Sequence, residues 1–308
     1  MKILNTYFCL LLLVVGFAQV DANEESSPIE EYSNMTTTQL DAAFVLAVRE
    51  GNSEKIEELL QAGANINTPI PYTWSSGDCD WRIESSALLF AVRKNDPNLV
   101  RVLLTGNPNL NEAFQEAINE GYSEVVEELI KGGADINYRY ANNNTHLILA
   151  VTQARATSEF SPQAHSRAIS RWSQRRHIIE MLLTAGANVS HVNKYGRTAL
   201  MEAVMQHDLN TVQKLLEIPE MTASPYFGFG TKPINYADQD GNTALILAIQ
   251  NVRCSYSNNQ EYNICRNSQD IINIFLENPG IDPHLVNKKG QTAIILLEEL
   301  HKKMNGYL

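Results

Sequence analysis

Residues 47–67 read AVREGNSEKIEELLQAGANIN, and residues 117–137 read AINEGYSEVVEELIKGGADIN. In both stretches an Ala precedes a Leu by 12 residues, a Gly lies four residues after the Ala, and another Gly follows the Leu-containing segment. This spacing predicts two helices joined by a tight turn. An Ala placed ahead of a Leu-Leu-like pair occurs six times along the chain, which predicts one helical unit stacked many times.

The first helix of most units begins with a short polar residue followed by a small or apolar run. A Ser or Thr at that place can accept a hydrogen bond from a free amide at the helix start. The small Ala lets two helices approach closely, and the Leu pair fills the space between units. Gly63 and Gly133 suit the left-handed conformation that ends a helix. The Ser- or Thr-led copies are residues 86–91 (SALLFA), 145–150 (THLILA), 198–203 (TALMEA), 243–248 (TALILA) and 292–297 (TAIILL).

This pattern resembles the ankyrin repeat, a β-turn followed by two antiparallel helices with a T-P-L-H-x-A signature and a 33-residue period. Turn sequences precede the later units at residues 193–196, 238–241 and 287–290. The copies lack the signature Pro, and His146 lies one place early. The resemblance covers residues 38–308. It implies an all-α ankyrin-repeat solenoid of about six and a half units with short β-hairpin turns and four inserts.

The repeat spacing is irregular. The third unit is predicted to have lost its hairpin, because Asn111 runs straight into Glu112. The last unit has only its first helix, which is typical of a terminal cap.

The N-terminus has the features of a secretory signal peptide. A short apolar stretch follows Lys2, and small residues stand before Asn23, so we expect residues 1–22 to be removed. That stretch is too short to span a bilayer, and no second one of spanning length exists. Residues 23–37 are expected to form a flexible acidic lead before the repeat domain, residues 38–308. The mature protein is therefore predicted to be exported, periplasmic or secreted, and not an integral membrane protein.

The net charge of −11 argues against general nucleic-acid binding, which needs a basic surface. Removing residues 1–22 takes away one Lys and one Asp and leaves that charge unchanged. The resemblance implies a protein partner bound on the concave face formed by hairpins and first helices. No cofactor is expected, and the chain is expected to be a monomer.

All three tryptophans lie in inserts, although the repeats need none for stacking. Two inserts, residues 68–85 and 218–233, are predicted at the hairpin edge. Their aromatic residues either form a recognition surface, since Trp and Tyr dominate interface hot spots, or cover the solenoid. The candidate partner-binding residues are Tyr72, Trp74, Trp81, Tyr226, Phe227 and Phe229.

The insert at about 152–176 differs in charge. Ser161 and Pro162 are typical of a helix start. Arg167, Arg171 and Arg175 then recur every four residues on one helical face, which could bind a carboxylate-rich or phosphorylated partner. Alternatively, this face is solvated, or paired with the second helix that carries Glu127 and Glu128.

Cys254 and Cys265 bracket the Asn/Ser-rich insert at 251–269, and export would favour a disulfide between them, leaving Cys79 unpaired. No metal site is predicted, because no Cys-x-x-Cys or His pair at ligand spacing occurs. No catalytic motif occurs either. The alternative to a binding module is an enzyme with a site built from the inserts. Such a site would use the Cys79 thiol or the fourth unit, whose histidines are His146, His165, His177 and His191.

Overall fold

The computed structural model describes residues 32, 34–76, 79–152, 162–222, 231–252 and 259–305. The chain divides into two compact units, residues 1–65 and residues 66–308. Helices dominate the described residues of both units.

The described part of the first unit is one helix pair. α3 (Thr37–Glu50) packs against α4 (Ser53–Gln61). Thr36 caps α3: its hydroxyl accepts from the Gln39 amide, and the Gln39 side chain accepts from the Thr36 amide. Gly51, at φ 71°, ends α3 in the left-handed conformation. The predicted helix–turn–helix unit is thus confirmed here.

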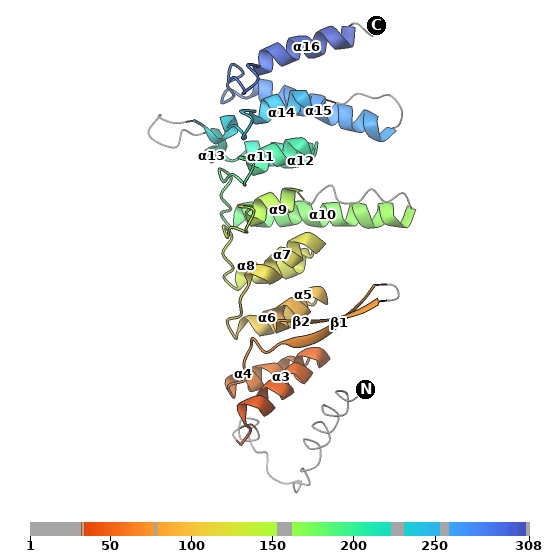
Figure 1. Ribbon diagram of the computed structural model, residues 1–308, viewed down its shortest axis with the longest axis vertical. Helices are drawn as coiled ribbons and strands as arrows, with labels where there is room; N and C mark the ends of the chain where they lie inside the picture. The colour runs from red at the N-terminus through yellow and green to blue at the C-terminus, as the bar shows by residue number, and fades with distance from the viewer. Residues whose placement is uncertain are drawn as a thin grey trace. The chain divides into compact units, whose positions relative to one another are not determined.

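The second compact unit, residues 66–308, is a stack of helix pairs, each of which is one repeat. Each first helix contacts the next first helix, and most second helices likewise contact the next (Figure 1). The first helices are α5 (Ala87–Arg93), α7 (Asn111–Glu120), α9 (His146–Thr152), α11 (Ala199–Met205), α14 (Ala244–Gln250) and α16 (Ala293–Asn305). The second helices are α6 (Pro97–Leu104), α8 (Ser123–Lys131), α10 (Pro162–Thr184), α12 (Leu209–Leu216) and α15 (Asn259–Glu277).

Four smaller elements lie in the connections between successive helix pairs of the chain. β1 (Ile70–Ser76) and β2 (Cys79–Ser85) precede α5. α13 (Pro219–Thr222) and the 3₁₀ helix η2 (Pro233–Asn235) lie between α12 and α14.

The predicted Ser and Thr caps are confirmed. Ser86 accepts a hydrogen bond from the amide of Leu89, Thr198 from that of Met201, and Thr243 from that of Ile246. Thr145 and Thr292 make the same kind of contact with the amides three residues on. Each cap satisfies an amide that has no partner inside its helix, at a typical gain of about 1 kcal/mol.

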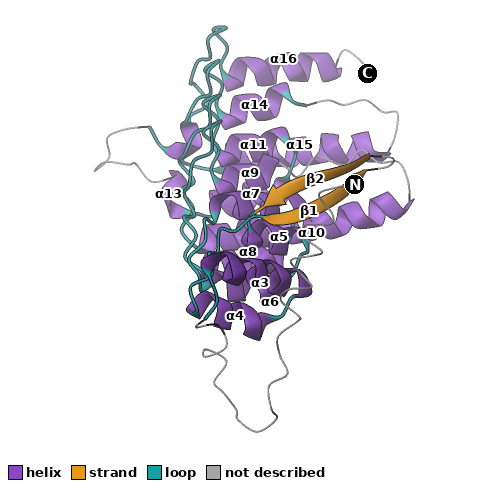
Figure 2. Ribbon diagram, turned by 60° about the horizontal axis from the view of Figure 1, so that its bottom comes forward, coloured by secondary structure: helices purple, strands orange, loops and turns teal. Residues whose placement is uncertain are grey.

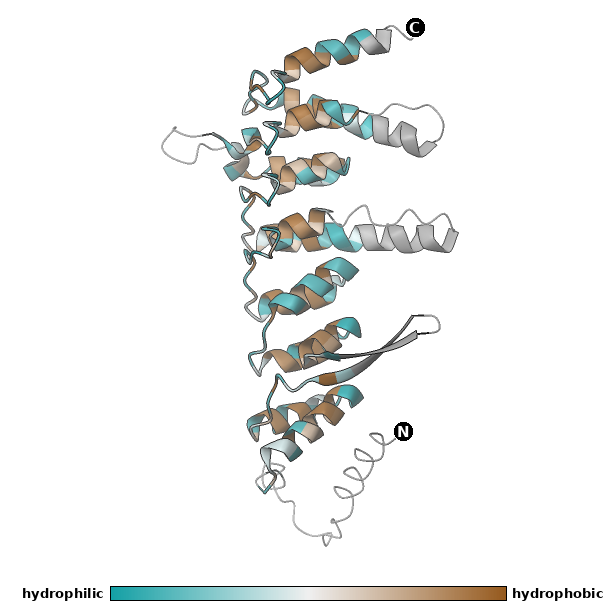
Figure 3. Ribbon diagram, viewed as in Figure 1, coloured by the Kyte–Doolittle hydropathy of each residue, from teal (hydrophilic) through white to brown (hydrophobic). Residues whose placement is uncertain are grey.

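The core of the stack consists of the apolar residues after each cap and the leucines of the second helices. Figure 3 shows the apolar colouring concentrated on α5, α9, α11 and α14. Full burial of a Leu stabilises the fold by about 2 kcal/mol, so these repeated positions supply the main driving force. Fully or almost fully buried examples are Leu88, Leu147, Leu200, Leu245, Leu103, Leu129, Leu182 and Leu215.

Hydrogen bonds join successive hairpins into a ladder, and the loops gather along one edge of the stack (Figure 2). The amide of Lys194 donates to the carbonyl of Asn142, and the amide of Gln239 donates to that of Tyr195. The amide of Lys288 continues the series to Asp240. Side chains add to it: Asn143 Nδ2 donates to the Val192 carbonyl at 2.7 Å.

The expectation that the third repeat lacks a hairpin is confirmed. Only six residues lie between the end of α6 and the start of α7 at Asn111, so the third repeat has no hairpin before its first helix. In the described residues no helix follows α16, which packs on α14. Ile294 and Ile295 of α16 are 36% and 42% exposed, whereas the equivalent Leu245 and Ile246 of α14 are 1% and 0% exposed.

Candidate functional site

The insert at 68–85 forms an antiparallel β-hairpin. Trp74 lies directly opposite Trp81, and Tyr72 lies opposite Ile83. Every second residue of a strand lies on the same face, and residues directly opposite each other share that face. These four residues therefore occupy one face of the hairpin. Thr73, Ser75, Asp80, Arg82 and Glu84 occupy the other face. The backbone therefore brings the two predicted tryptophans together.

The base of this hairpin belongs to the core. Ile70 is fully buried and its opposite residue, Ser85, is 5% exposed. From there the strands run toward the edge to which α10 and α15 extend, as Figures 1 and 2 show. The sequence predicts this insert at the edge with the hairpin loops, and the structure differs. The difference arises because the strands cross back along the helices instead of forming a loop where they begin.

The arginine series divides between two environments. α10 begins at Pro162, as predicted, and includes Arg167, Arg171 and Arg175. Arg175 is 6% exposed, and its guanidinium donates to the Asn119 carbonyl near the end of α7 at 3.1 Å. Arg175 thus holds α10 on α7, because a buried guanidinium needs hydrogen-bond acceptors. This finding argues against its role in binding an anionic partner. The side chains of Arg167 and Arg171 lie outside the described residues.

Glu127 and Glu128 pair with basic residues outside the arginine series. Arg101 of α6 donates twice to the Glu128 carboxylate, at 2.8 and 3.1 Å. Lys131 pairs with both glutamates at 2.9 and 3.2 Å. The hydrogen bond from Arg101 outweighs burial and lowers the pKa of Glu128 to about 2. This pairing of α6 with α8 stabilises the stack and does not involve α10.

Several predicted residues cannot be placed. Tyr226, Phe227 and Phe229 lie outside the described residues, as does Cys254. Cys265 belongs to α15, but its side chain is also outside them. The Cys254–Cys265 disulfide and the free state of Cys79 stay predictions.

The three histidines of the fourth repeat whose side chains are described, His146, His177 and His191, lie in separate environments. His146 is fully buried among Phe114, Tyr138 and Tyr140, with ring centroids 4.1 to 6.4 Å away. Its Nδ1 donates to the Ile136 carbonyl at 3.2 Å, while burial lowers its pKa to about 4. His191 makes a 2.9 Å hydrogen bond to a hairpin carbonyl. His177 is exposed on α10, and His165 has no described side chain.

One hydroxyl–imidazole contact has no signal in the sequence. Ser268 Oγ lies 2.9 Å from His207 Nδ1, and Asn267 donates to the His207 carbonyl at 3.3 Å. The residues come from α15 and from the turn after α11, 61 positions apart, so local spacing gave no signal. Ser268 is 2% exposed. The contact therefore attaches a turn to the neighbouring second helix and leaves Ser268 inaccessible to a substrate.

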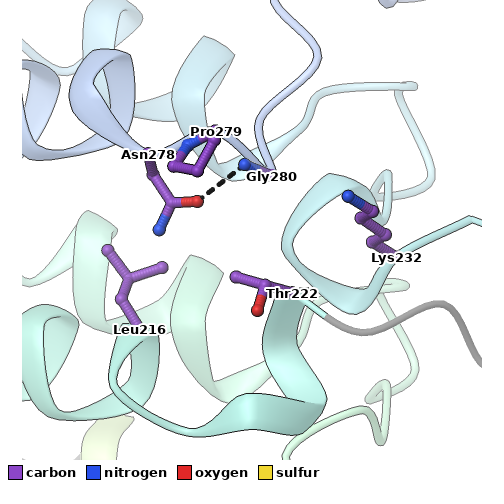
Figure 4. A pocket seen from close by; sticks show the side chains of 6 residues that line it. All are labelled: Leu216, Thr222, Lys232, Asn278, Pro279 and Gly280. Atoms are coloured by element: carbon purple, nitrogen blue, oxygen red, sulfur yellow. Dashed lines mark hydrogen bonds between the residues drawn. The ribbon is translucent and has the colours of Figure 1, made fainter.

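Two open cavities border α12. One, of about 350 Å³, is lined by Gln213, Leu216, Glu217 and Ile274. The other, of about 430 Å³, is shown in Figure 4, where Asn278 accepts a 2.9 Å hydrogen bond from the Gly280 amide. No Cys, Ser or His is among the lining residues of either cavity, so neither combines a thiol or serine nucleophile with a histidine base. The second cavity is lined by Leu216, Thr222, Lys232, Asn278, Pro279 and Gly280.

The described part of the chain holds no cluster of His, Cys, Asp or Glu suited to a metal ion. None of the helices in the described ranges combines the length and apolar character that a membrane span requires.

A family model described as ankyrin repeats (3 copies) matches residues 44–140 and again residues 167–260. The chain belongs to the ankyrin-repeat family. The region between the two matches includes the connection from α9 to α10, where the repeat spacing is longest. The predicted fold is confirmed.

Several known proteins are similar to this ankyrin-repeat chain. The putative ankyrin repeat protein L91 of Acanthamoeba polyphaga mimivirus is 25% identical over 175 residues, 56% of this chain and 22% of that protein. The mouse B-cell lymphoma 3 protein homolog is 30% identical over 115 residues, which are 35% of this chain and 23% of that protein. The human mitochondrial disaggregase is 24% identical over 282 residues, 87% and 33% of the two chains. The chain spans a third or less of each of these relatives.

Among solved structures, the ankyrin repeat domain of Bcl-3, described as a unique member of the IkappaB protein family, is similar to this chain. The TM-score is 0.55 at 20% sequence identity, and the match covers 82% of this chain and 92% of that domain. At this identity the likeness shows the fold.

Proposed function

We propose that this ankyrin-repeat chain is an exported binding module for a protein partner, and that it is not an enzyme. The observation that carries the proposal is the register of the β1–β2 hairpin. It places Trp74 opposite Trp81 on one face, beside Tyr72 and Ile83. Paired aromatic residues supply large contact area at small conformational cost and dominate interface hot spots.

The arrangement of the stack supports the same proposal. The hairpin runs to the edge toward which the N-terminal half of α10 also extends (Figure 1). The sequence of that half includes Arg167 and Arg171, so the aromatic hairpin and an arginine-containing helix extend toward the same edge. A partner with apolar side chains and carboxylates would match this composition. Fold membership alone identifies no partner.

A double substitution tests the aromatic surface. Replacing Trp74 and Trp81 by Ala should weaken capture of the main partner by about a thousandfold, since each anchor typically contributes about 2 kcal/mol. The control is Thr73→Ala with Glu84→Ala, which changes the other face of the same hairpin. Melting curves of both variants establish that they are folded. Normal binding by a folded double Trp variant would overturn the proposal, and so would its unfolding, which would assign these residues to covering the stack.

Export is tested separately. The first residue of the protein isolated from the native envelope or culture medium should be Asn23, because small residues precede it in the pattern of a signal-peptidase site. Retention of residues 1–22 in the cytoplasm would contradict this part of the proposal.

A further inference from the structure

The β1–β2 hairpin has two unpaired edges, because the described residues contain no third strand in its sheet. Two residues separate the paired Ser76 and Cys79, so this pair is hydrogen-bonded, and the ladder alternates from there. The register therefore defines which backbone groups point away from the partner strand. On β1 they belong to Pro71, Thr73 and Ser75, and on β2 to Asp80, Arg82 and Glu84.

The two edges differ in their ability to accept another strand. Pro71 has no N–H, and a Pro at an outward position is a common protection of an edge strand. β1 is also the strand that packs against α5. β2 has a backbone donor and acceptor at each outward position. Its edge is thus the one open to strand addition.

The edge of β2 complements itself. Along its outward positions the charge alternates, from Asp80 through Arg82 to Glu84. In an antiparallel pair of identical strands, outward residues face outward residues. Arg82 can therefore face Arg82, Asp80 or Glu84 of a second copy, and like charges directly opposite are unfavourable. Pairing with Asp80 creates two unlike pairs, because the two-fold axis repeats each contact.

The same register brings the tryptophans together. With Arg82 opposite Asp80 of a second copy, Trp81 lies opposite Trp81 of that copy. Trp74 already lies opposite Trp81 within each hairpin, so four tryptophans form one row across one face of the joined sheet. Aromatic cross-strand pairs stabilise sheets, and opposite residues are closest at non-hydrogen-bonded positions such as this one. The Glu84 register would instead oppose Trp81 to Ser85, at the buried base of the hairpin.

We propose that the chain self-associates through β2, forming a two-fold four-stranded sheet with Asp80 opposite Arg82 and Trp81 opposite Trp81. The occupant of this edge is a second copy of the chain. This inference departs from the expected monomer and does not depend on the protein partner proposed above.

Charge exchange provides the first test. Sedimentation of the wild-type chain over a concentration series should show a monomer–dimer equilibrium. Arg82→Asp alone and Asp80→Arg alone should each weaken association by roughly tenfold or more, because each places like charges opposite one another. Mixing the two variants should restore dimers, since both pairs between positions 80 and 82 are then unlike. Wild-type chain that stays monomeric up to its solubility limit, or variants that fail to associate when mixed, would overturn the proposal.

Proline provides the second test with a matched control. Thr73 and Arg82 are register partners, and both are at outward positions. Arg82→Pro should abolish association by removing the amide that pairs with the second copy, whereas Thr73→Pro should leave association unchanged. Equal loss in both variants would refute the assignment to β2. Because Arg82→Asp keeps both tryptophans, loss of dimer with unchanged partner capture separates this proposal from the previous one.

Discussion

At the scale of single residues, burial determines how His146 titrates. The ring is fully buried among three aromatic rings, and desolvation of the charged form lowers its pKa from 6.5 to about 4. The hydrogen bond from Nδ1 to the Ile136 carbonyl opposes this effect without cancelling it. His146 is therefore neutral in the folded chain at physiological pH.

We expect His146 to make stability fall in mild acid. Above pH 6.5 the ring is neutral in both the folded and the unfolded chain. Between pH 6.5 and about 4 only the unfolded chain takes up the proton. The free energy of unfolding therefore falls by about 2 kcal/mol between neutral pH and pH 5, and by about 3 kcal/mol once the pH is below 4. Urea unfolding at pH 7.5 and pH 5 should show this loss in the wild type and not in His146→Phe. Parallel pH profiles of the two proteins would contradict it.

Residue patterns alone could not separate exposed from buried charge. A four-residue spacing relates Arg167, Arg171 and Arg175 to one helical face, but burial depends on where a neighbouring helix crosses that face. α7 ends beside Arg175, and Asn119 supplies the acceptor 56 positions away in sequence. Such a tertiary contact has no local signature. Caps and left-handed glycines were predictable because their chemistry lies within three or four residues.

At the scale of elements, the missed structure was the β1–β2 hairpin. Its signal is present in the sequence, since apolar and polar residues alternate from Ile70 to Ile83 around a Gly-Asp turn. The aromatic composition of the insert indicates a recognition surface, whereas its two-residue period indicates the strands. Its path along the helices follows from packing at its base and was not predictable from that period.

Ion pairing between α6 and α8 gives an element-scale prediction. Arg101→Ala should lower the melting temperature only slightly, because Arg101 is 63% exposed and solvent partly screens its ion pair with Glu128. The lowered pKa of Glu128 means that this stabilisation is present above pH 4.5 and is lost as the pH falls toward 2. Lys289→Ala, at an exposed hairpin lysine, is the control. Thermal melts in low and high salt measure the effect. If the difference in melting temperature between the wild type and Arg101→Ala is the same at both salt concentrations, the stabilisation is not ionic.

At the scale of the whole molecule, each unit of the stack depends on its neighbour for burial. α16 covers α14, although its own outer residues Ile294 and Ile295 are partly exposed. Removing residues 283–308 should therefore uncover Leu245 and Ile246. We expect the shortened chain to lose solubility and melt at lower temperature, whereas Ile295→Lys should be tolerated far better than Ile246→Lys. An unchanged melting temperature after truncation would contradict the capping role of α16.

The hairpin ladder has a consequence for producing this protein in a glycosylating host. Asn143-Asn144-Thr145 is an acceptor sequence for N-linked sugars. In the folded chain, however, the Asn143 side-chain nitrogen is held at 2.7 Å from the Val192 carbonyl of the next hairpin. An oligosaccharide can reach that nitrogen only before folding, and once attached it would keep the two hairpins apart. Sugar at Asn143 should therefore be found on misfolded chains and be missing from the folded product.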